Sequence, residues 1–255
     1  KERQSNCFDF NSYLRGLMIN IRMNRLIYPG WKNIVHVDFE THVFISPLLI
    51  SIPNVELIIC DNAPLTLAML WRLKPVFEMN PNKTWKYEHV ICRDLDSPTT
   101  YREAQAVQHW IQNDTAMHAI TDSVSHNVPL MGGMIGIKPR YFTERVAQSW
   151  QQMLDKGNGN YEWSYKGTDQ TFLNQFIYPM FGSKGSESIT QHYILGHGNT
   201  FLNDWHNSIP DLELPGVPEE MKESNSVCGH IGAAGFYSPP MFKFLQKNKE
   251  RFADL

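Results

Sequence analysis

Two aspartates, Asp94 and Asp96, stand one residue apart directly after the apolar run Val90-Ile91-Cys92. The apolar run predicts a strand, and the Ser97-Pro98 pair that follows predicts a turn. Two carboxylates at positions i and i+2, where the chain bends, can face one divalent cation and leave open positions for a phosphate. A solvated loop would accommodate the same two aspartates, so the pattern alone leaves both interpretations open.

The composition is that of an ordinary globular protein. The chain has 255 residues, of which 42% are hydrophobic and 19% charged, and this length supports one large domain with a substantial core. We find no internal repeat and no domain boundary, so we expect a single domain over residues 1–255. The formal net charge of -3 gives no electrostatic reason to expect a nucleic-acid partner.

The cysteines indicate a reducing compartment. Cys7, Cys60, Cys92 and Cys228 are far apart and form no C-x-x-C pair, and Cys60 and Cys92 end apolar runs, which predicts buried thiols. No apolar run approaches the ~20 residues that a membrane-spanning helix needs, and no signal-peptide pattern is present. We therefore expect a cytoplasmic protein without a membrane span.

Stretches of strand character alternate with stretches of helical periodicity. The alternation predicts an α/β fold with a mostly parallel sheet flanked by helices. Thr100 and Glu103 form a capping box at one helix start, and periodicity fades after Phe181, which predicts an irregular C-terminal third. The predicted strands are residues 34–38, 55–60, 90–92 and 130–137, and the predicted helices are residues 13–26, 43–52, 64–71, 100–111, 142–153 and a last one from residue 168.

The predicted strands end in acidic residues. Asp38, Asp61, Asp94 and Asp96 follow three different strands, and the carboxyl ends of strands are where open α/β sheets bind ligands. Asp38 and Asp61 could equally be solvated strand ends.

Five segments resemble, in the same order, nucleotide-sugar-dependent glycosyltransferases of the GT-A fold. The resemblance covers residues 13–194 and is to the type found in bacterial and large-DNA-virus glycan synthesis, chlorella viruses included. The segments are Tyr28-Pro29-Gly30-Trp31, Leu70-Trp71-Arg72, Arg93-Asp94-Leu95-Asp96-Ser97, Gly132-Gly133-Met134 and Lys166-Gly167-Thr168-Asp169-Gln170.

The resemblance implies a fold and an activity. It implies a Rossmann-like GT-A domain that moves a sugar from a nucleotide diphosphate donor to a hydroxyl group of a sugar or oligosaccharide acceptor. UDP is the commonest nucleotide partner of a D-x-D site, and we lean slightly towards inversion at the anomeric carbon. A viral member would act in the host cytoplasm.

The resemblance also implies how the donor phosphates are bound. Asp94 and Asp96 would be the D-x-D pair that holds Mn²⁺ or Mg²⁺, and Asp94 would also reach the nucleotide. The cation would neutralise the leaving diphosphate. Arg72 and Arg93 would add positive charge at the phosphates, unless they form surface ion pairs.

Further residues correspond to sugar-contacting and catalytic positions of that family. Asp122 and His126 resemble a D-x-x-x-H sugar contact, and Gly132 and Gly133 would let the backbone approach the donor sugar or would form a strand bulge. Asp169 resembles the acidic residue that faces the acceptor, so it is the candidate general base of an inverting enzyme. It would also suit a helix N-terminus as a first-turn acid.

Two points of the resemblance are less closely matched. A C-terminal histidine often completes the metal site in GT-A enzymes, and His192 or His197 could do so here. The GT-A fold also opens with a strand ahead of the first helix; either residues 7–10 supply it as a short, irregular strand, or residues ahead of Lys1 are absent from the numbering.

Two other functions remain open from the residues alone. A metal-dependent phosphohydrolase uses a strand-end D-x-D as nucleophile and acid/base, but it places that strand near the start of the domain. A sugar-binding module without catalysis would need neither the D-x-D pair nor an acid at Asp169.

Overall fold

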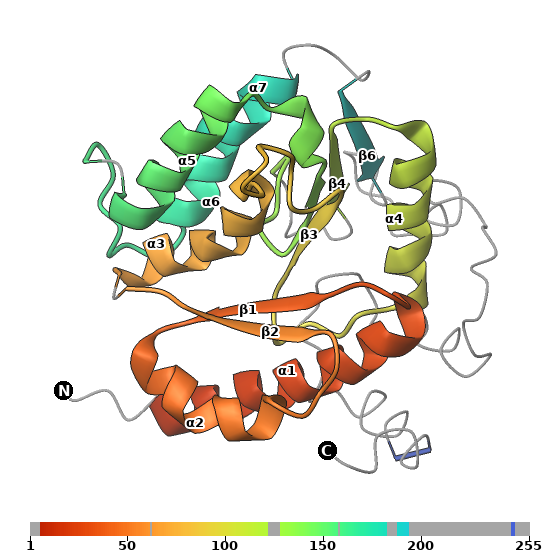
Figure 1. Cartoon of the computed structure of the whole chain (residues 1–255), viewed down its shortest axis with the longest axis vertical. Coiled ribbons are helices and arrows are strands. Elements are labelled where there is room, and N and C mark those ends of the chain that lie inside the picture. Colours follow the sequence, from red (N-terminus) through yellow and green to blue (C-terminus); the bar gives the residue numbers. More distant parts are fainter. Residues whose placement is uncertain are drawn as a thin grey trace, which may run out of the picture.

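The computed structural model describes residues 6–61, 63–121, 128–157, 159–182, 188–193 and 246–247. Within these residues the strands form two separate sheets (Figure 1). One sheet pairs β1 (Asn33–Val37) with β2 (Val55–Ile59), and the other has the order β3 (Val90–Arg93), β5 (Met134–Ile137), β4 (Met117–Thr121) and β6 (Ile189–Tyr193).

The α/β class is confirmed, but the expectation of a mostly parallel sheet is wrong. β1 pairs with β2, and β4 with β6, in parallel, whereas β5 lies between β3 and β4 and is antiparallel to both. A strand that returns beside its predecessor needs no crossover helix and so runs antiparallel. The strand predicted over residues 130–137 is also shorter than expected, because Gly132 and Gly133 lie in the turn that precedes Met134.

Helices cover both sheets. In Figure 1, α4 lies on one side of the four-stranded sheet and α5, α6 and α7 on the other, while α1 and α2 lie along the two-stranded sheet. The segments are α1 (Asn6–Ile27), α2 (Phe39–Leu49), α3 (Leu65–Met69) with the 3₁₀ helix η1 (Leu70–Phe77), α4 (Tyr101–Asn113), η2 (Pro139–Tyr141), α5 (Glu144–Lys156), and α6 (Thr168–Phe172), which continues through the π-helical η3 (Leu173–Ile177) into α7 (Tyr178–Gly182).

The first helix is longer than its periodicity suggests. α1 includes residues 7–10, so this segment is helical rather than an opening strand. The strand that opens the sheet region is β1, which follows the turn at Gly30, where the backbone has φ 84°. Among the residues that the structure describes, the first strand therefore follows the first helix.

Side-chain caps begin two helices, and the one at Thr100 is at the predicted place. Thr100 accepts a hydrogen bond of 3.2 Å from the Glu103 backbone N–H at the start of α4. Asp38 accepts one of 2.6 Å from the Thr41 backbone N–H at the start of α2. These contacts satisfy backbone donors that have no partner within the helix, so Asp38 serves as a helix cap.

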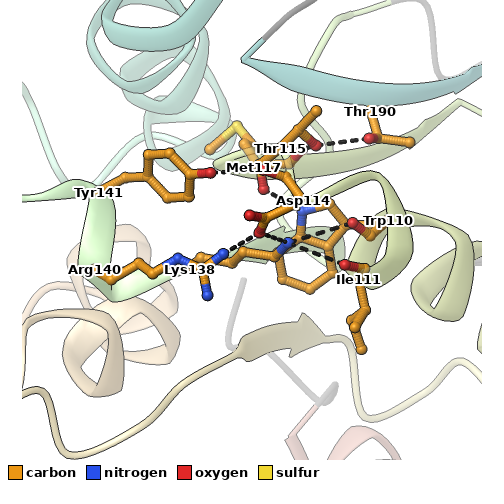
Figure 2. Close-up of polar contacts among 9 residues, drawn as sticks. All are labelled: Trp110, Ile111, Asp114, Thr115, Met117, Lys138, Arg140, Tyr141 and Thr190. Carbon is orange, nitrogen blue, oxygen red and sulfur yellow. Dashed lines mark hydrogen bonds and ion pairs between the residues drawn. The ribbon is translucent and has the colours of Figure 1, made fainter.

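A buried lysine joins the end of α4 to β5 (Figure 2). Lys138 is fully buried, and its Nζ donates to Asp114 at 2.8 Å and to the backbone carbonyls of Trp110 and Ile111 at 3.4 Å each. The Tyr141 hydroxyl donates to the Asp114 carbonyl at 2.6 Å. A cation suits the C-terminal end of a helix, where carbonyl groups lack partners. The contact fixes α4 against β5, and both elements flank β3.

α1 packs on two sides at once. Ile19 and Met23 join the hydrophobic group formed with α4, while Leu17 and Ile21 join the group formed with β1 and α2. The largest apolar core lies on the other face of the four-stranded sheet, against η1, α5, α6 and α7. α1 is thus the element that connects the two-stranded sheet to α4.

Two further expectations concern the cysteine thiols and membrane-spanning helices. The thiols of Cys60 and Cys92 are buried, as predicted. Within the described ranges, no helix has the length and apolar character that crossing a bilayer requires.

Candidate functional site

The first aspartate of the D-x-D pair lies against Gly133, which immediately precedes the neighbouring strand β5. β3 and β5 are antiparallel with Arg93 opposite Met134, so the next residues of each, Asp94 and Gly133, also face one another. A Cβ atom at Gly133 would lie 2.1 Å from the Asp94 Oδ2 and 2.4 Å from its Cγ. The carboxylate therefore occupies the space that any side chain at this position would fill.

Arg72 binds the other oxygen of the same carboxylate. Its Nη1 donates to the Asp94 Oδ1 at 2.6 Å, and its Nε donates to the Met69 carbonyl at 2.7 Å. Burial favours a lower pKa for Arg72, but the charge of Asp94 and its hydrogen bond outweigh this and raise the pKa. The guanidinium is therefore firmly charged and is held in place at both ends.

The start of α6 is bound to the glycine turn by amide side chains. Gln170 accepts from the Gly132 backbone N–H at 3.2 Å and donates to the Leu130 carbonyl. Asn174, one helical turn further on, donates to the Leu130 carbonyl and accepts from its N–H, both at 2.9 Å. Sequence reasoning missed Asn174 and took Gln170 only as part of a motif; the available signal was an amide pair at i and i+4, which lies on one helix face.

Docking of α6 brings Asp169 towards Arg72 and Asp94. Asp169 is buried, and this burial raises the pKa of its carboxyl. A backbone hydrogen bond and the charge of Arg72 act in the opposite direction, and the charge of Asp94 raises the pKa further. Arg72, Asp94 and Asp169 come from three of the five segments that carry the resemblance, so the structure unites those segments.

The second aspartate shares this electrostatic environment. Burial raises the pKa of Asp96, and the nearby charge of Asp94 adds to that effect, while Arg72 and Arg93 oppose it. Asp94, Asp96 and Asp169 thus all lie within electrostatic range of Arg72, which contacts Asp94 directly. We refer to Arg72, Asp94, Asp96, Gly133 and Asp169 as the carboxylate site. The site has three carboxylates and one arginine, so a bound cation would balance part of its negative charge.

Arg93 has a buried partner of its own. Its Nη1 lies 2.6 Å from the Glu103 carboxylate, with 13% and 4% of the two side chains exposed. Its Nη2 also donates to the Ser97 carbonyl at 3.2 Å. The alternative of a surface ion pair is therefore wrong, and the pair instead links β3 to the first turn of α4.

A cavity adjoins the carboxylate site. It has a volume of about 640 Å³ and is lined by residues of α1, β1, η1 and β3, Arg72 and Arg93 among them. Tyr28 and Trp31, with ring centroids 5.4 Å apart, form part of the lining. His89 also lines the cavity, and its ring centroid lies 6.4 Å from that of Trp31. The cavity wall thus contains arginines near the C-terminal end of β3 and aromatic rings elsewhere.

The structure does not bring His192 to the aspartates. His192 lies on β6, is buried against α4, and its Nε2 is 3.4 Å from the Ala106 carbonyl. Its ring centroid lies 5.2 Å from those of both His109 and His118. Burial, with a contribution from His109, lowers the pKa of His192 to about 4. It is thus a neutral interior residue, and its assignment as a metal ligand has no geometric support.

Three candidates lie outside the described residues: Asp122, His126 and His197. In the part of the chain that the structure describes, no group of three or more His, Cys, Asp or Glu side chains could hold a metal ion. A cation at the carboxylate site would therefore use few protein ligands. Mg²⁺ sites commonly do so, with one or two carboxylates and the rest supplied by substrate phosphates and water.

Comparison with protein-family models, with curated proteins and with solved structures finds no match for this chain.

The contact between Gly133 and Asp94 predicts that alanine is tolerated at one glycine and not at its neighbour. A Cβ at Gly132 would meet its nearest atom, the Leu173 Cδ1, at 3.4 Å, an ordinary contact. We expect Gly133→Ala to lower the free energy of unfolding by about 1–3 kcal/mol, as overpacking does, and Gly132→Ala to cost much less. Urea denaturation measures both. Equal losses would show that Asp94 does not fill the space beside Gly133.

The buried histidines predict loss of stability in acid. Because folding lowers the pKa of His192 from 6.5 to about 4, its contribution is present above pH 6.5 and is lost as the pH falls towards 4. A shift of this size corresponds to at most ~3 kcal/mol. Unfolding free energies at pH 7.5 and 4.5 should differ less in His192→Gln than in wild type. The control is His42→Gln, on α2 and outside this group; if it flattened the pH dependence as much, the interpretation would be wrong.

Proposed function

We propose that this chain is a glycosyltransferase that moves a sugar from a nucleotide diphosphate to a hydroxyl group of a glycan acceptor, with a divalent cation. The observation that supports the proposal is the meeting of Asp94, Gly133 and Asp169 around Arg72. These residues come from segments far apart in the sequence. A solvated loop at Asp94 would require none of these contacts.

The charge of the carboxylate site suits a cation such as Mn²⁺ or Mg²⁺. Burial and the charge of Asp94 raise the pKa of Asp96. A cation bound nearby would favour the ionised form of this carboxylate. Asp94 and Asp96 would hold the cation through carboxylate oxygens, the ligands that these hard metals prefer. When bound, it would neutralise charge on the leaving diphosphate.

The cavity supports binding of the nucleoside part of the donor. Its volume of about 640 Å³ lies in the usual range for small-molecule sites, which combine apolar walls with a few polar groups. The ring of Trp31, which is partly exposed, offers a face for a nucleobase, and Arg72 lies towards the end where phosphates would reach the aspartates. UDP is the first nucleotide to test.

Asp169 supports the chemical step. A buried carboxylate with a raised pKa is a better proton acceptor than an exposed one. In an inverting transfer Asp169 would take the proton of the acceptor hydroxyl while the hydroxyl oxygen bonds to the anomeric carbon. The bond from that carbon to the diphosphate breaks at the same time, and its electron pair leaves with the diphosphate.

The phosphohydrolase alternative is less well supported. It requires the first aspartate as a free nucleophile, whereas one oxygen of Asp94 is bound by Arg72 at 2.6 Å and the other lies against Gly133.

The test is a transfer assay with a matched pair of variants. Mass spectrometry of an incubation with mixed nucleotide sugars, candidate acceptors and Mn²⁺ identifies the product. Asp169→Asn should then lower the transfer rate by ~10²–10⁴-fold, the usual contribution of a general base, with donor binding nearly unchanged.

Glu144→Gln is the control, because Glu144 is likewise a first-turn acid of a helix but lies on α5 and pairs with Lys83 at 3.2 Å. A rate within threefold of wild type for folded Asp169→Asn would remove Asp169 from the chemistry. Absence of any glycosyl product across the donor set would count against the function as a whole.

A further inference from the structure

One side chain from α1 holds the turn that carries Asp96. Asn20 is buried, and its Nδ2 donates to the Ser97 carbonyl at 2.9 Å and to the Leu95 carbonyl at 3.3 Å. Its Oδ1 accepts from the Thr99 backbone N–H at 2.9 Å and from the Thr99 hydroxyl at 3.2 Å. Two of these contacts are on the residues immediately before and after Asp96.

The chemistry of these contacts is specific to asparagine. A side-chain amide has two donor hydrogens and one oxygen with two lone pairs, and all four are used here. The pattern also fixes the orientation of the amide, because the reverse orientation would set its oxygen against two carbonyl oxygens. Aspartate has no donor for the two carbonyls, and leucine, of similar shape, can make none of the four contacts.

The support for the turn comes from two directions. Asn20 reaches it from α1, whose packing on α4 and β1 is apolar, and Arg93 reaches the Ser97 carbonyl from β3 at 3.2 Å. Two contacts thus converge on Ser97, next to Asp96. Groups that lie behind the direct ligands of a metal commonly orient them.

We propose that Asn20 is a positioning residue that holds Asp96 in the orientation used to bind the divalent cation. The inference rests on the proposed function for the role of Asp96, but the hold on the turn is independent of it. Asn20 is buried and also lines the adjoining cavity. It acts through the backbone of residues 95–99.

The test compares Asn20→Asp and Asn20→Leu with Met23→Ala. Met23 is a fully buried residue of α1 in the apolar contact with α4, so its truncation destabilises the same helix without touching the turn. The first readout is hydrogen–deuterium exchange of the peptide over residues 94–100 in the protein alone. Exchange there should increase in Asn20→Leu and not in Met23→Ala.

The second readout is calorimetric binding of UDP with and without Mn²⁺. Loss of a group that orients a metal ligand typically costs 10–100-fold in metal affinity, so we expect Asn20→Asp to lower Mn²⁺-dependent affinity by that range and Met23→Ala to leave it near wild type. Unchanged exchange in Asn20→Leu overturns the proposal, and so does unchanged affinity in Asn20→Asp. Failure of wild type to bind UDP and Mn²⁺ overturns the assigned cation role together with the proposed function, and the exchange result then still decides whether Asn20 holds the turn.

Discussion

The ion pair between Arg72 and Asp94 depends on the missing side chain at Gly133. One carboxylate oxygen is bound by the guanidinium at 2.6 Å, and the other lies where a Cβ of Gly133 would be. This arrangement is possible because β5 runs antiparallel to β3 with Arg93 opposite Met134. The direction of one short strand therefore determines which side chains surround the first aspartate.

Three other parts of the molecule hold the contact between Arg72, Asp94 and Gly133 in place. Gln170 of α6 and Asn174 of η3 bind the backbone of the glycine turn and of Leu130, and Asn20 of α1 binds the turn after Asp94. In the third part, Lys138 ties the end of α4 to β5. Directional hydrogen bonds fix the positions of the loops. The apolar groups behind them contribute buried surface, but they do not fix the orientation of a carboxylate.

The sequence predicted most of the helices and the strands β1, β2, β3 and β5, but not β4 or β6. Helical periodicity located α1, and the cap at Thr100 is confirmed, because both depend on neighbours within a few residues. The antiparallel direction of β5 was not predicted, since strand alternation does not reveal which strands pair. The interior position of His192 was missed for a similar reason: a histidine on a strand has the same spacing whether it faces a core or a ligand. Gln170 was taken only as part of a motif, although it binds the glycine turn directly.

The central claim is that the aspartates beside Arg72 form the cation and phosphate end of a nucleotide-sugar site. The most direct measurement is the position of Mn²⁺, located by anomalous scattering in crystals of the chain grown with UDP and Mn²⁺. The account predicts a peak bonded to a carboxylate oxygen of Asp94 or Asp96, with the diphosphate of UDP beside it and the uridine in the adjoining cavity. A Mn²⁺ peak at His109 and His192, or UDP bound away from both aspartates, would contradict it.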